Sequence, residues 1–283
     1  MSLKSLLSAA FLAQLLAVGV FAAAAAAAPP ARADDDPGRA PNLPAPPSLL
    51  SAGRPSAPQA ARGFAGMPQF GELVWQNPDG SPGAKLCSAV TVQSAGGDLI
   101  ATAAHCVGGV SSRIGGSMTV AYLPGAADGS TPYGVWYPTR IIRPRQWMNK
   151  AKNPDFDIAF LTVSQPGESR SLESITGAER FGALPADGTL GVQIGYPYAD
   201  SGPVACRTAI HFRSRTQLRL DCANFPSGTS GGPVLTHVDP VDGIGTLVGV
   251  IGGYQSGGAH SYVSYASAFT PAIRRLYLQA SQY

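Results

Sequence analysis

Near its C-terminal end the chain carries the sequence Gly228-Thr229-Ser230-Gly231-Gly232-Pro233. Glycines on both sides of a serine let the backbone turn tightly and leave the hydroxyl exposed. A nucleophilic serine needs such access, together with a base and with donors for the oxyanion that forms. The stretch therefore predicts Ser230 as a nucleophile, with the backbone N–H groups of Gly228 and Ser230 as oxyanion donors.

The residues that follow this stretch decide between two folds. The same letters satisfy G-x-S-x-G of the α/β-hydrolases (lipases and esterases), in which a helix directly follows the serine. Here the sequence continues through Gly231–Thr236 to Pro240, which no helix accommodates. Asp239, Asp242 and His260 stand in the order that such an enzyme needs, but the segment is too short for βα units between them. The α/β-hydrolase fold is therefore disfavoured.

The rest of the chain has the pattern of an all-β protein. Short apolar runs such as Ile158–Val163 and Thr246–Ile251 are separated by turn residues, and the 283 residues include 34 Gly and 25 Pro. Many short strands of this kind are typical of barrels or sandwiches. The polar stretch Ser164–Gly182 divides them into two halves, and a terminal helix is expected with Thr270 as N-cap and Pro271 at its first position.

Two upstream residues are candidates for the partners of the serine. His105 ends the apolar run Leu99–Ala104, and Asp157 opens an apolar strand. A carboxylate that enters a core costs free energy unless it is paired, and orienting a catalytic histidine is one such pairing. Asp155 is the competing acid. Asp157 is preferred because it directly adjoins the apolar run, whereas Asp155 fits an ordinary turn.

Three stretches resemble, in order, the motifs of trypsin-like (chymotrypsin-fold) serine peptidases: Thr102-Ala103-Ala104-His105-Cys106, Asp157-Ile158-Ala159 and Gly228–Pro233. The resemblance covers about residues 63–283. It implies two perpendicular six-stranded antiparallel β-barrels, with His105 and Asp157 on the first, Ser230 on the second and substrate in the cleft between them. The implied activity is that of a serine endopeptidase without a cofactor, in which these three residues form the catalytic triad.

The N-terminal region is predicted to direct export. Lys4 precedes an Ala-rich apolar stretch from about Leu6 to Ala28, and Ala31-Arg32-Ala33 provides an A-x-A cleavage site. Residues 1–33 are therefore interpreted as a signal peptide of a secreted, extracellular protein. The alternative is an uncleaved membrane anchor, which the weakly apolar alanines disfavour.

The predicted organisation has three parts. After the signal, residues 34–62 form a Pro-rich stretch that cannot bury enough apolar area to order itself, and we expect a flexible spacer or propeptide. Residues 63–283 form the peptidase domain. Its first barrel spans about 63–165, its second barrel about 183–269 and its C-terminal helix about 270–281.

Export to an oxidising compartment turns the four cysteines into two expected disulfides. Three connectivities are open, and we favour Cys87 with Cys106 and Cys206 with Cys222, the pairs closest along the chain. The resemblance also implies a disulfide between the cysteine beside the histidine and an earlier one. No C-x-x-C is present, so no zinc site is expected.

Several positions depart from the pancreatic members of the family. Thr229 stands where those enzymes carry an Asp that pairs with a new N-terminus, and Gly252 where many members have a Ser that supports the triad Asp. Gly195-Tyr196-Pro197 and Cys222 look more like the bacterial V8-like branch.

The same alignment assigns the substrate-binding residues. Asn224 falls at the position of the Asp that selects Lys or Arg in trypsin, and Gly252 and Gly253 fall on the strand that lines the substrate site. A neutral amide should not favour a basic side chain. The V8-like branch uses a His near Gly252–Gly253 to select Glu, and none stands there; His260 lies further on, in an expected solvated loop. The preferred residue stays open.

The composition argues against nucleic acid and metal ions as binding partners. The formal net charge is +3 and charged residues make up 13% of the chain, so no basic stripe is available for nucleic acid. No acidic cluster has the spacing of calcium ligands, and no metal is expected. We expect a monomer that acts on protein or peptide substrates and does not contact a membrane after signal cleavage. A catalytically inactive, protease-like binding or adhesion protein is the alternative, and the complete triad disfavours it.

Overall fold

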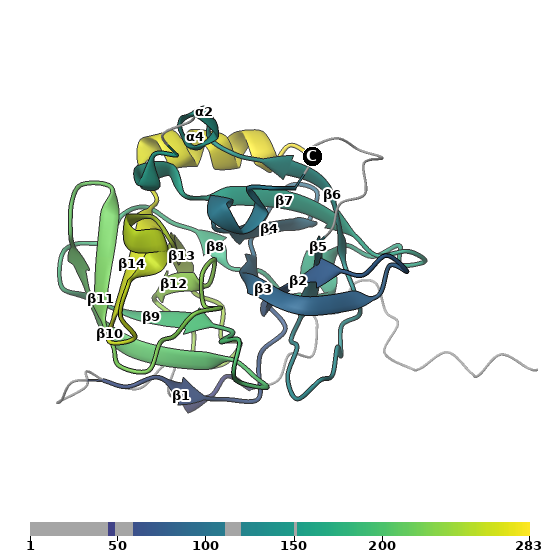
Figure 1. The fold of residues 1–283 in the computed structure, drawn as a ribbon, viewed down its shortest axis with the longest axis horizontal. Coiled ribbons are helices and arrows are strands. Elements are labelled where there is room, and N and C mark those ends of the chain that lie inside the picture. The colour runs from purple at the N-terminus through teal and green to yellow at the C-terminus, as the bar shows by residue number, and fades with distance from the viewer. Residues whose placement is uncertain (1–44, 49–58, 111–119, 150–151) are drawn as a thin grey trace, which may run out of the picture. The chain divides into compact units, whose positions relative to one another are not determined.

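β-Strands dominate the computed structural model, which describes residues 45–48, 59–110, 120–149 and 152–283 (Figure 1). Within these residues the strands form one sheet of six strands and one of eight. The helices among them are short: α2 (Arg145–Met148), α3 (Leu172–Thr176), α4 (Pro271–Ala280) and the 3₁₀ turns η1 (Ala104–Val107), η2 (Pro154–Phe156) and η3 (Tyr254–Gly257). The predicted all-β class is confirmed.

The first sheet is a six-stranded barrel with a narrow seam. Its strands are β2 (Phe70–Gln76), β3 (Pro82–Thr91), β4 (Leu99–Thr102), β5 (Val120–Pro124), β6 (Tyr137–Ile142) and β7 (Ala159–Ser164), in the order β5-β2-β3-β4-β7-β6. Next to the edge strands, Tyr122 and Trp136 exchange backbone hydrogen bonds of 2.8 and 2.9 Å, which join β5 to the start of β6. Both side chains are fully buried, so the seam is also filled from inside.

The second sheet contains a closed barrel of six strands. These are β9 (Thr189–Gly195), β10 (Val204–Phe212), β11 (Gln217–Asp221), β12 (Pro233–Thr236), β13 (Thr246–Ile251) and β14 (Val263–Ala268). Strand β9 pairs with both β10 and β12, which closes the ring β9-β10-β11-β14-β13-β12. Two short strands add to it: β1 (Arg62–Gly63) on β10 and β8 (Arg180–Phe181) on β13. The predicted pair of antiparallel barrels is confirmed.

The two barrels share one apolar core. Phe70 and Val90 of the first barrel belong to the same buried cluster as Leu235 and Val250 of the second. Each of these side chains is fully buried, and burying one contributes about 1.5–3 kcal/mol. The interface between the barrels is therefore apolar and packed like the interior of a domain.

The disulfides lie within the barrels. Cys87 of β3 is bonded to Cys106 of η1, and Cys206 of β10 is bonded to Cys222, which follows β11. These are the two predicted pairs. No disulfide joins one barrel to the other in the part of the chain that is described, where every cysteine is paired in this way.

The C-terminal helix α4 returns to the first barrel. Thr270 Oγ1 accepts a hydrogen bond from the backbone of Ile273 at 3.5 Å, so the predicted N-cap is formed. Figure 1 shows α4 lying over β7. Tyr277 stacks on Phe181 at 4.0 Å between ring centroids, and its hydroxyl donates to the Gln93 carbonyl oxygen at 2.7 Å. The helix thereby attaches the end of the described chain to the first barrel through Gln93 and to the second sheet through Phe181.

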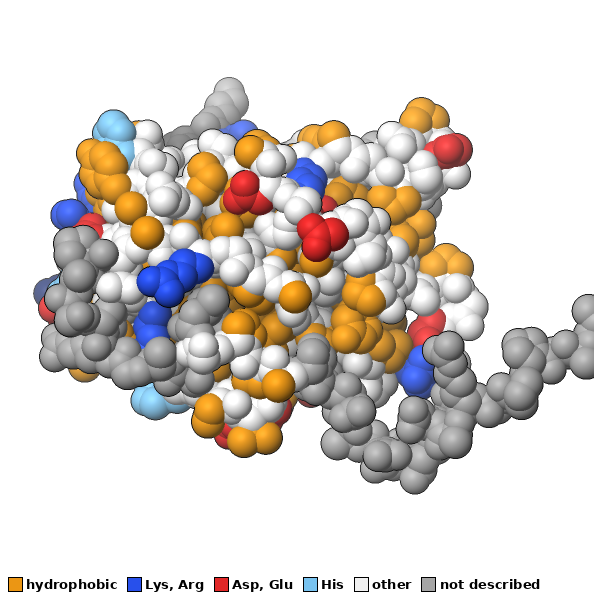
Figure 2. Space-filling model, turned by 90° about the horizontal axis from the view of Figure 1, so that it is seen from below, with side chains coloured by type: hydrophobic (Ala, Val, Ile, Leu, Met, Phe, Trp, Pro, Cys, Tyr) orange, Lys and Arg blue, Asp and Glu red, His pale blue; other side chains and the backbone are white. Residues whose placement is uncertain are grey.

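The predicted signal peptide lies outside the described residues, as does most of the predicted spacer. Residues 59–62, at the end of that spacer, run beside the second barrel, where Ala61 donates to the Ala223 carbonyl at 2.8 Å. Among the described helices, none combines the length and the apolar character needed to cross a bilayer. Figure 2 shows one face of the molecule, on which basic and acidic side chains are few and interspersed.

Glu179 joins the two barrels from a buried position. Its backbone N–H donates to the Thr91 carbonyl at 2.9 Å, and its own carbonyl accepts from Gln93 at 3.0 Å. Its side chain is 0% exposed, and Oε2 accepts the Gly245 N–H at 2.5 Å. Burial raises the pKa of this carboxyl from its usual 4.5 to about 8, because the low-dielectric interior disfavours the charged form.

The Glu179→Gln variant should be less sensitive to pH than the wild type. Since the folded-state pKa lies above the unfolded one, stability is fully present below about pH 4.5 and is lost as the pH rises towards 8. We expect wild-type stability to fall by a few kcal/mol, to order of magnitude, between pH 5 and 9. The glutamine should flatten that slope, as measured by chemical denaturation at each pH. Glu168→Gln is the control: hydrogen bonds from Arg170 lower the pKa of Glu168 to about 2, so this carboxyl is ionised in both the folded and the unfolded state between pH 5 and 9, and the curve of the variant should run parallel to the wild type. A parallel curve for Glu179→Gln would contradict the assignment.

Candidate active site

The buried carboxylate of Asp157 lies at the centre of the site. Asn153 caps the turn η2 by accepting the backbone N–H of Asp155 at 3.0 Å, and the turn ends at Asp157 just before β7. Asp157 is 1% exposed. The competitor Asp155 points elsewhere: its Oδ1 accepts a hydrogen bond from Gln217 at 3.4 Å. Of the two acids, the structure brings Asp157 to the histidine.

His105 is held on Asp157 at two points. Its backbone N–H donates to Asp157 Oδ1 at 2.8 Å, and its ring Nδ1 lies 2.7 Å from Oδ2. The next residue, Cys106, is tied to β3 through Cys87, which anchors the turn that carries the imidazole. The His105 side chain is 25% exposed, so the ring meets the buried acid at Nδ1 and still reaches solvent in part.

Gly252 and Gly253 both contact the Asp157 carboxylate. A Cβ on Gly252 would lie 2.9 Å from Asp157 Oδ2, so the acid approaches more closely than any side chain at that position would allow. The Gly253 N–H donates to the same Oδ2 at 2.8 Å. The Asp157 carboxylate is therefore supported by the backbone of the second barrel and not by a side chain at position 252.

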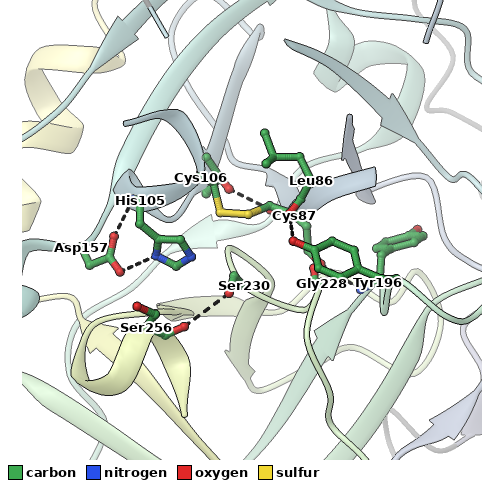
Figure 3. Close-up of a disulfide and its surroundings, with 12 residues drawn as sticks. Leu86, Cys87, His105, Cys106, Asp157, Tyr196, Gly228, Ser230 and Ser256 are labelled. Carbon is green, nitrogen blue, oxygen red and sulfur yellow. Dashed lines mark hydrogen bonds and ion pairs between the residues drawn. A yellow bond between two sulfur atoms is a disulfide. The ribbon is translucent and has the colours of Figure 1, made fainter. Parts of the chain in front are cut away.

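Ser230 lies on the other side of the imidazole from Asp157 (Figure 3). Gly231 has φ 80°, and a Cβ there would meet the Ala103 nitrogen at 3.1 Å, so the turn after the serine requires glycine. The Ser230 hydroxyl donates to the Ser256 carbonyl at 3.4 Å, and within the described residues it makes no hydrogen bond to His105. The N–H groups of Gly228 and Ser230 likewise have no acceptor among these residues. Both predicted donors are available to a ligand.

A cavity of about 400 Å³ opens beside Ser230. Phe225, Ile251 and Val263 give it an apolar floor, since each is less than a tenth exposed. Ser227, Ser261 and His260 also line it, and no aspartate or glutamate does so within the described part of the chain. His260, expected in a solvated loop, is exposed and stacks on Tyr262 with ring centroids 5.1 Å apart at the rim.

The structure places the three predicted substrate-binding residues elsewhere. Asn224 lines a separate depression with Asp128 and Asp200, and its backbone is left-handed at φ 59°. Gly252 and Gly253 contact the Asp157 carboxylate and do not line the cavity. Counting back from the serine misses the cavity by one position, because the next residue, Phe225, does line it. Apart from Gly228–Ser230, which belong to the serine motif, the residues that line the cavity carry no pattern that the sequence would have marked.

Comparisons with known proteins agree with this geometry. A family model described as "Trypsin-like peptidase domain" matches residues 87–250. Three similar solved structures are a protease Anisep from Arthrobacter nicotinovorans (21% identity, TM-score 0.63, covering 79% of this chain and 100% of that one), a thermostable serine protease AL20 from an extremophilic microorganism (22%, 0.61, 76% and 97%) and a Glu endopeptidase in complex with MPD (15%, 0.60, 80% and 98%). At these identities the likeness is one of fold. No curated protein matches the sequence.

The Gly252→Ala variant should disturb the histidine–aspartate pair. Because a Cβ would lie 2.9 Å from Asp157 Oδ2 and 3.2 Å from Ala103 Cβ, the carboxylate must shift, at a cost of about 1–3 kcal/mol in stability. We expect the low-field proton NMR signal of His105 Nδ1–H to move upfield or broaden. Gly109→Ala is the matched control, since a Cβ there meets nothing within 4 Å. An unchanged signal in Gly252→Ala would contradict the tight contact.

Proposed function

The chain belongs to the trypsin-like peptidase domain family, and on that premise we propose that it is a secreted serine endopeptidase whose triad is His105, Asp157 and Ser230. The observation that carries the proposal is the fixed histidine: two hydrogen bonds of 2.8 and 2.7 Å hold His105 on a buried carboxylate, with Ser230 next to the ring (Figure 3). No other described histidine has a buried acid as its partner, because His211 pairs only with the exposed Asp187.

The hydrogen bonds around Asp157 support the proposed role of His105 as the base. Three N–H groups converge on the carboxylate, from the His105 backbone, the His105 ring and Gly253. An ionised acid accepts all three, so Nδ1 carries the proton and Nε2 keeps its lone pair. Nε2 is then a base on the side of Ser230, and Asp157 stabilises the imidazolium that forms when the base takes a proton.

Acylation begins when the Ser230 hydroxyl turns from the Ser256 carbonyl to Nε2. Oγ attacks the peptide carbonyl carbon while its proton passes to His105. The carbonyl oxygen becomes an oxyanion that the N–H groups of Gly228 and Ser230 stabilise. As the C–N bond breaks, His105 gives the proton to the leaving amine, and an ester joins the acyl group to Ser230.

Deacylation repeats these steps with water. His105 takes a proton from the water, whose oxygen attacks the ester carbonyl, and the tetrahedral intermediate uses the same two N–H groups. When the ester C–O bond breaks, His105 returns the proton to Ser230 Oγ. The carboxylic acid product leaves and the resting site is restored.

Secretion is supported by the sequence and by the cysteines. The Ala-rich N-terminus has the features of a signal peptide, and both disulfides are of the kind that persists outside the cytosol.

Covalent labelling with a fluorophosphonate tests the triad. We expect the processed wild type to label, Ser230→Ala not to label, and Asp157→Asn to label about 10⁴-fold more slowly, the size of effect typical of this family's triad. His105→Ala should be slowed at least as much, because it loses the base itself. Circular dichroism should confirm that each variant is folded. A folded wild type that fails to label would reject the peptidase and favour a binding protein on a peptidase scaffold.

A peptide library tests the specificity of the cavity. Since no described carboxylate lines the cavity, nothing there compensates the charge of a lysine or arginine side chain. Cleavage after uncharged or acidic residues should exceed cleavage after Lys or Arg by about tenfold or more, as measured by kcat/KM. Preferred cleavage after Lys or Arg would show that the cavity beside Ser230 is not the specificity pocket.

A further inference from the structure

The oxyanion donors belong to a glycine-containing loop whose peptide planes must be fixed. In a trans peptide the C=O and the following N–H point in opposite directions. The Ser227 carbonyl accepts the Tyr198 N–H at 3.1 Å, and the Thr229 carbonyl accepts the Gly232 N–H at 3.0 Å. The N–H groups of Gly228 and Ser230 therefore point away from these partners. The carbonyls of Ser227 and Thr229 thus set the planes of the two donor peptides directly. The carbonyls of Gly228 and Ser230 belong to the adjoining peptides, and holding them limits rotation of the donor planes between them; residues 227–230 are called the oxyanion loop.

Ser88 holds the remaining two carbonyls of the oxyanion loop. Its hydroxyl donates to the Gly228 oxygen at 3.1 Å, and its backbone N–H donates to the Ser230 oxygen at 2.7 Å. Ser88 lies on β3 of the first barrel and is 1% exposed (Figure 3 labels Gly228 and Ser230). Both contacts cross from one barrel to the other.

The direction of the Ser88 hydroxyl proton is determined by its surroundings. The oxygen accepts the Tyr196 N–H at 2.8 Å, which occupies a lone pair, so the single proton is directed to Gly228. The Ser88 carbonyl accepts the Thr102 hydroxyl at 2.8 Å. A buried network in which every member is satisfied favours one arrangement over others.

Tyr198 confines the oxyanion loop from the solvent side. A Cβ on Gly228 would lie 2.6 Å from the Tyr198 nitrogen and 2.9 Å from its ring. The Tyr198 hydroxyl donates to the Leu86 carbonyl at 2.7 Å, two residues before Ser88 on β3. Gly228 has φ 101°, a backbone conformation that glycine adopts easily and leaves easily. The glycine therefore does not hold the loop in this conformation by itself, and its neighbours restrict the backbone rotation.

We propose that Ser88 and Tyr198 are positioning residues for the oxyanion hole. Ser88 fixes the Gly228 and Ser230 carbonyls from the first barrel, and Tyr198 fixes the Ser227 carbonyl while its hydroxyl ties it to the same strand. Neither residue touches the reacting atoms through these bonds; they act by keeping the Gly228 and Ser230 N–H groups aimed at the oxyanion. The proposal rests on the proposed function of the site.

Burst kinetics with 4-nitrophenyl acetate separate positioning from folding. The burst amplitude counts competent sites, and the burst rate constant reports acylation at each site. For Ser88→Ala we expect a rate constant about 10–100-fold below the wild type, with an amplitude near one per folded molecule. The pH midpoint of that rate constant should stay unchanged, because the histidine–aspartate pair is untouched.

Thr176→Val is the matched control. Thr176 is fully buried in α3, and its hydroxyl contacts the carbonyls of Leu172 and Gly177 at 2.9 and 2.8 Å. Its loss removes a buried hydroxyl away from the oxyanion loop. We expect a lower melting temperature and a wild-type burst rate constant.

Tyr198→Phe tests the same loop without entering the core, since Tyr198 is 52% exposed. We expect a rate constant about 3–10-fold lower at full amplitude, and this variant decides the question if Ser88→Ala does not fold. Wild-type rate constants in the folded variants would overturn the positioning role while leaving the peptidase proposal intact. Absence of both a burst and steady-state hydrolysis of the ester in the folded wild type would instead reject the proposed function itself.

Discussion

The site depends on a negative charge held inside the protein. An isolated carboxylate at the burial of Asp157 would cost several kcal/mol, and the pairing partners that remove this cost come from both barrels. His105 contributes two N–H groups from the first barrel and Gly253 one from the second. The charge is therefore compensated only when the barrels are docked, and the docked arrangement is also the one that brings Ser230 to the imidazole.

Docking is reinforced on the opposite side of the serine. Ser88 of the first barrel binds the oxyanion loop of the second. Glu179 makes hydrogen bonds to Thr91 in the first barrel and to Gly245, next to β13, in the second. The histidine–aspartate pair thus lies on one side of Ser230 and the proposed oxyanion donors on the other. A shared apolar core lies behind them and excludes water from the polar contacts.

The sequence was sufficient to predict the parts of the site and of the fold that depend on short motifs. His105, Asp157 and Ser230 are brought together, the disulfide pairs are those expected from proximity along the chain, and Thr270 caps the last helix. It was insufficient to predict the contacts that cross from one barrel to the other. Asn224 was assigned by counting back from the serine, whereas its neighbour Phe225 lines the cavity. No pattern marks Ser88, because its partners are backbone carbonyls about 140 residues later. The turn that contacts the serine hydroxyl contains left-handed Gln255 and Ser256, which residue type does not predict.

The placement of the disulfides has a consequence for how the protein loses its shape. Each closes a short loop, of 19 and 16 residues, inside a single barrel. Covalent bonds thus make each barrel resist unravelling, whereas the plane between them relies on packing and hydrogen bonds. A parting of the barrels along that plane would leave two covalently closed halves, a partial rather than a global unfolding, at the cost of exposing their shared core. Since His105 and Asp157 lie on one side of that plane and Ser230 on the other, such an opening would divide the proposed site while both barrels stay folded, and re-closure would restore it without new folding.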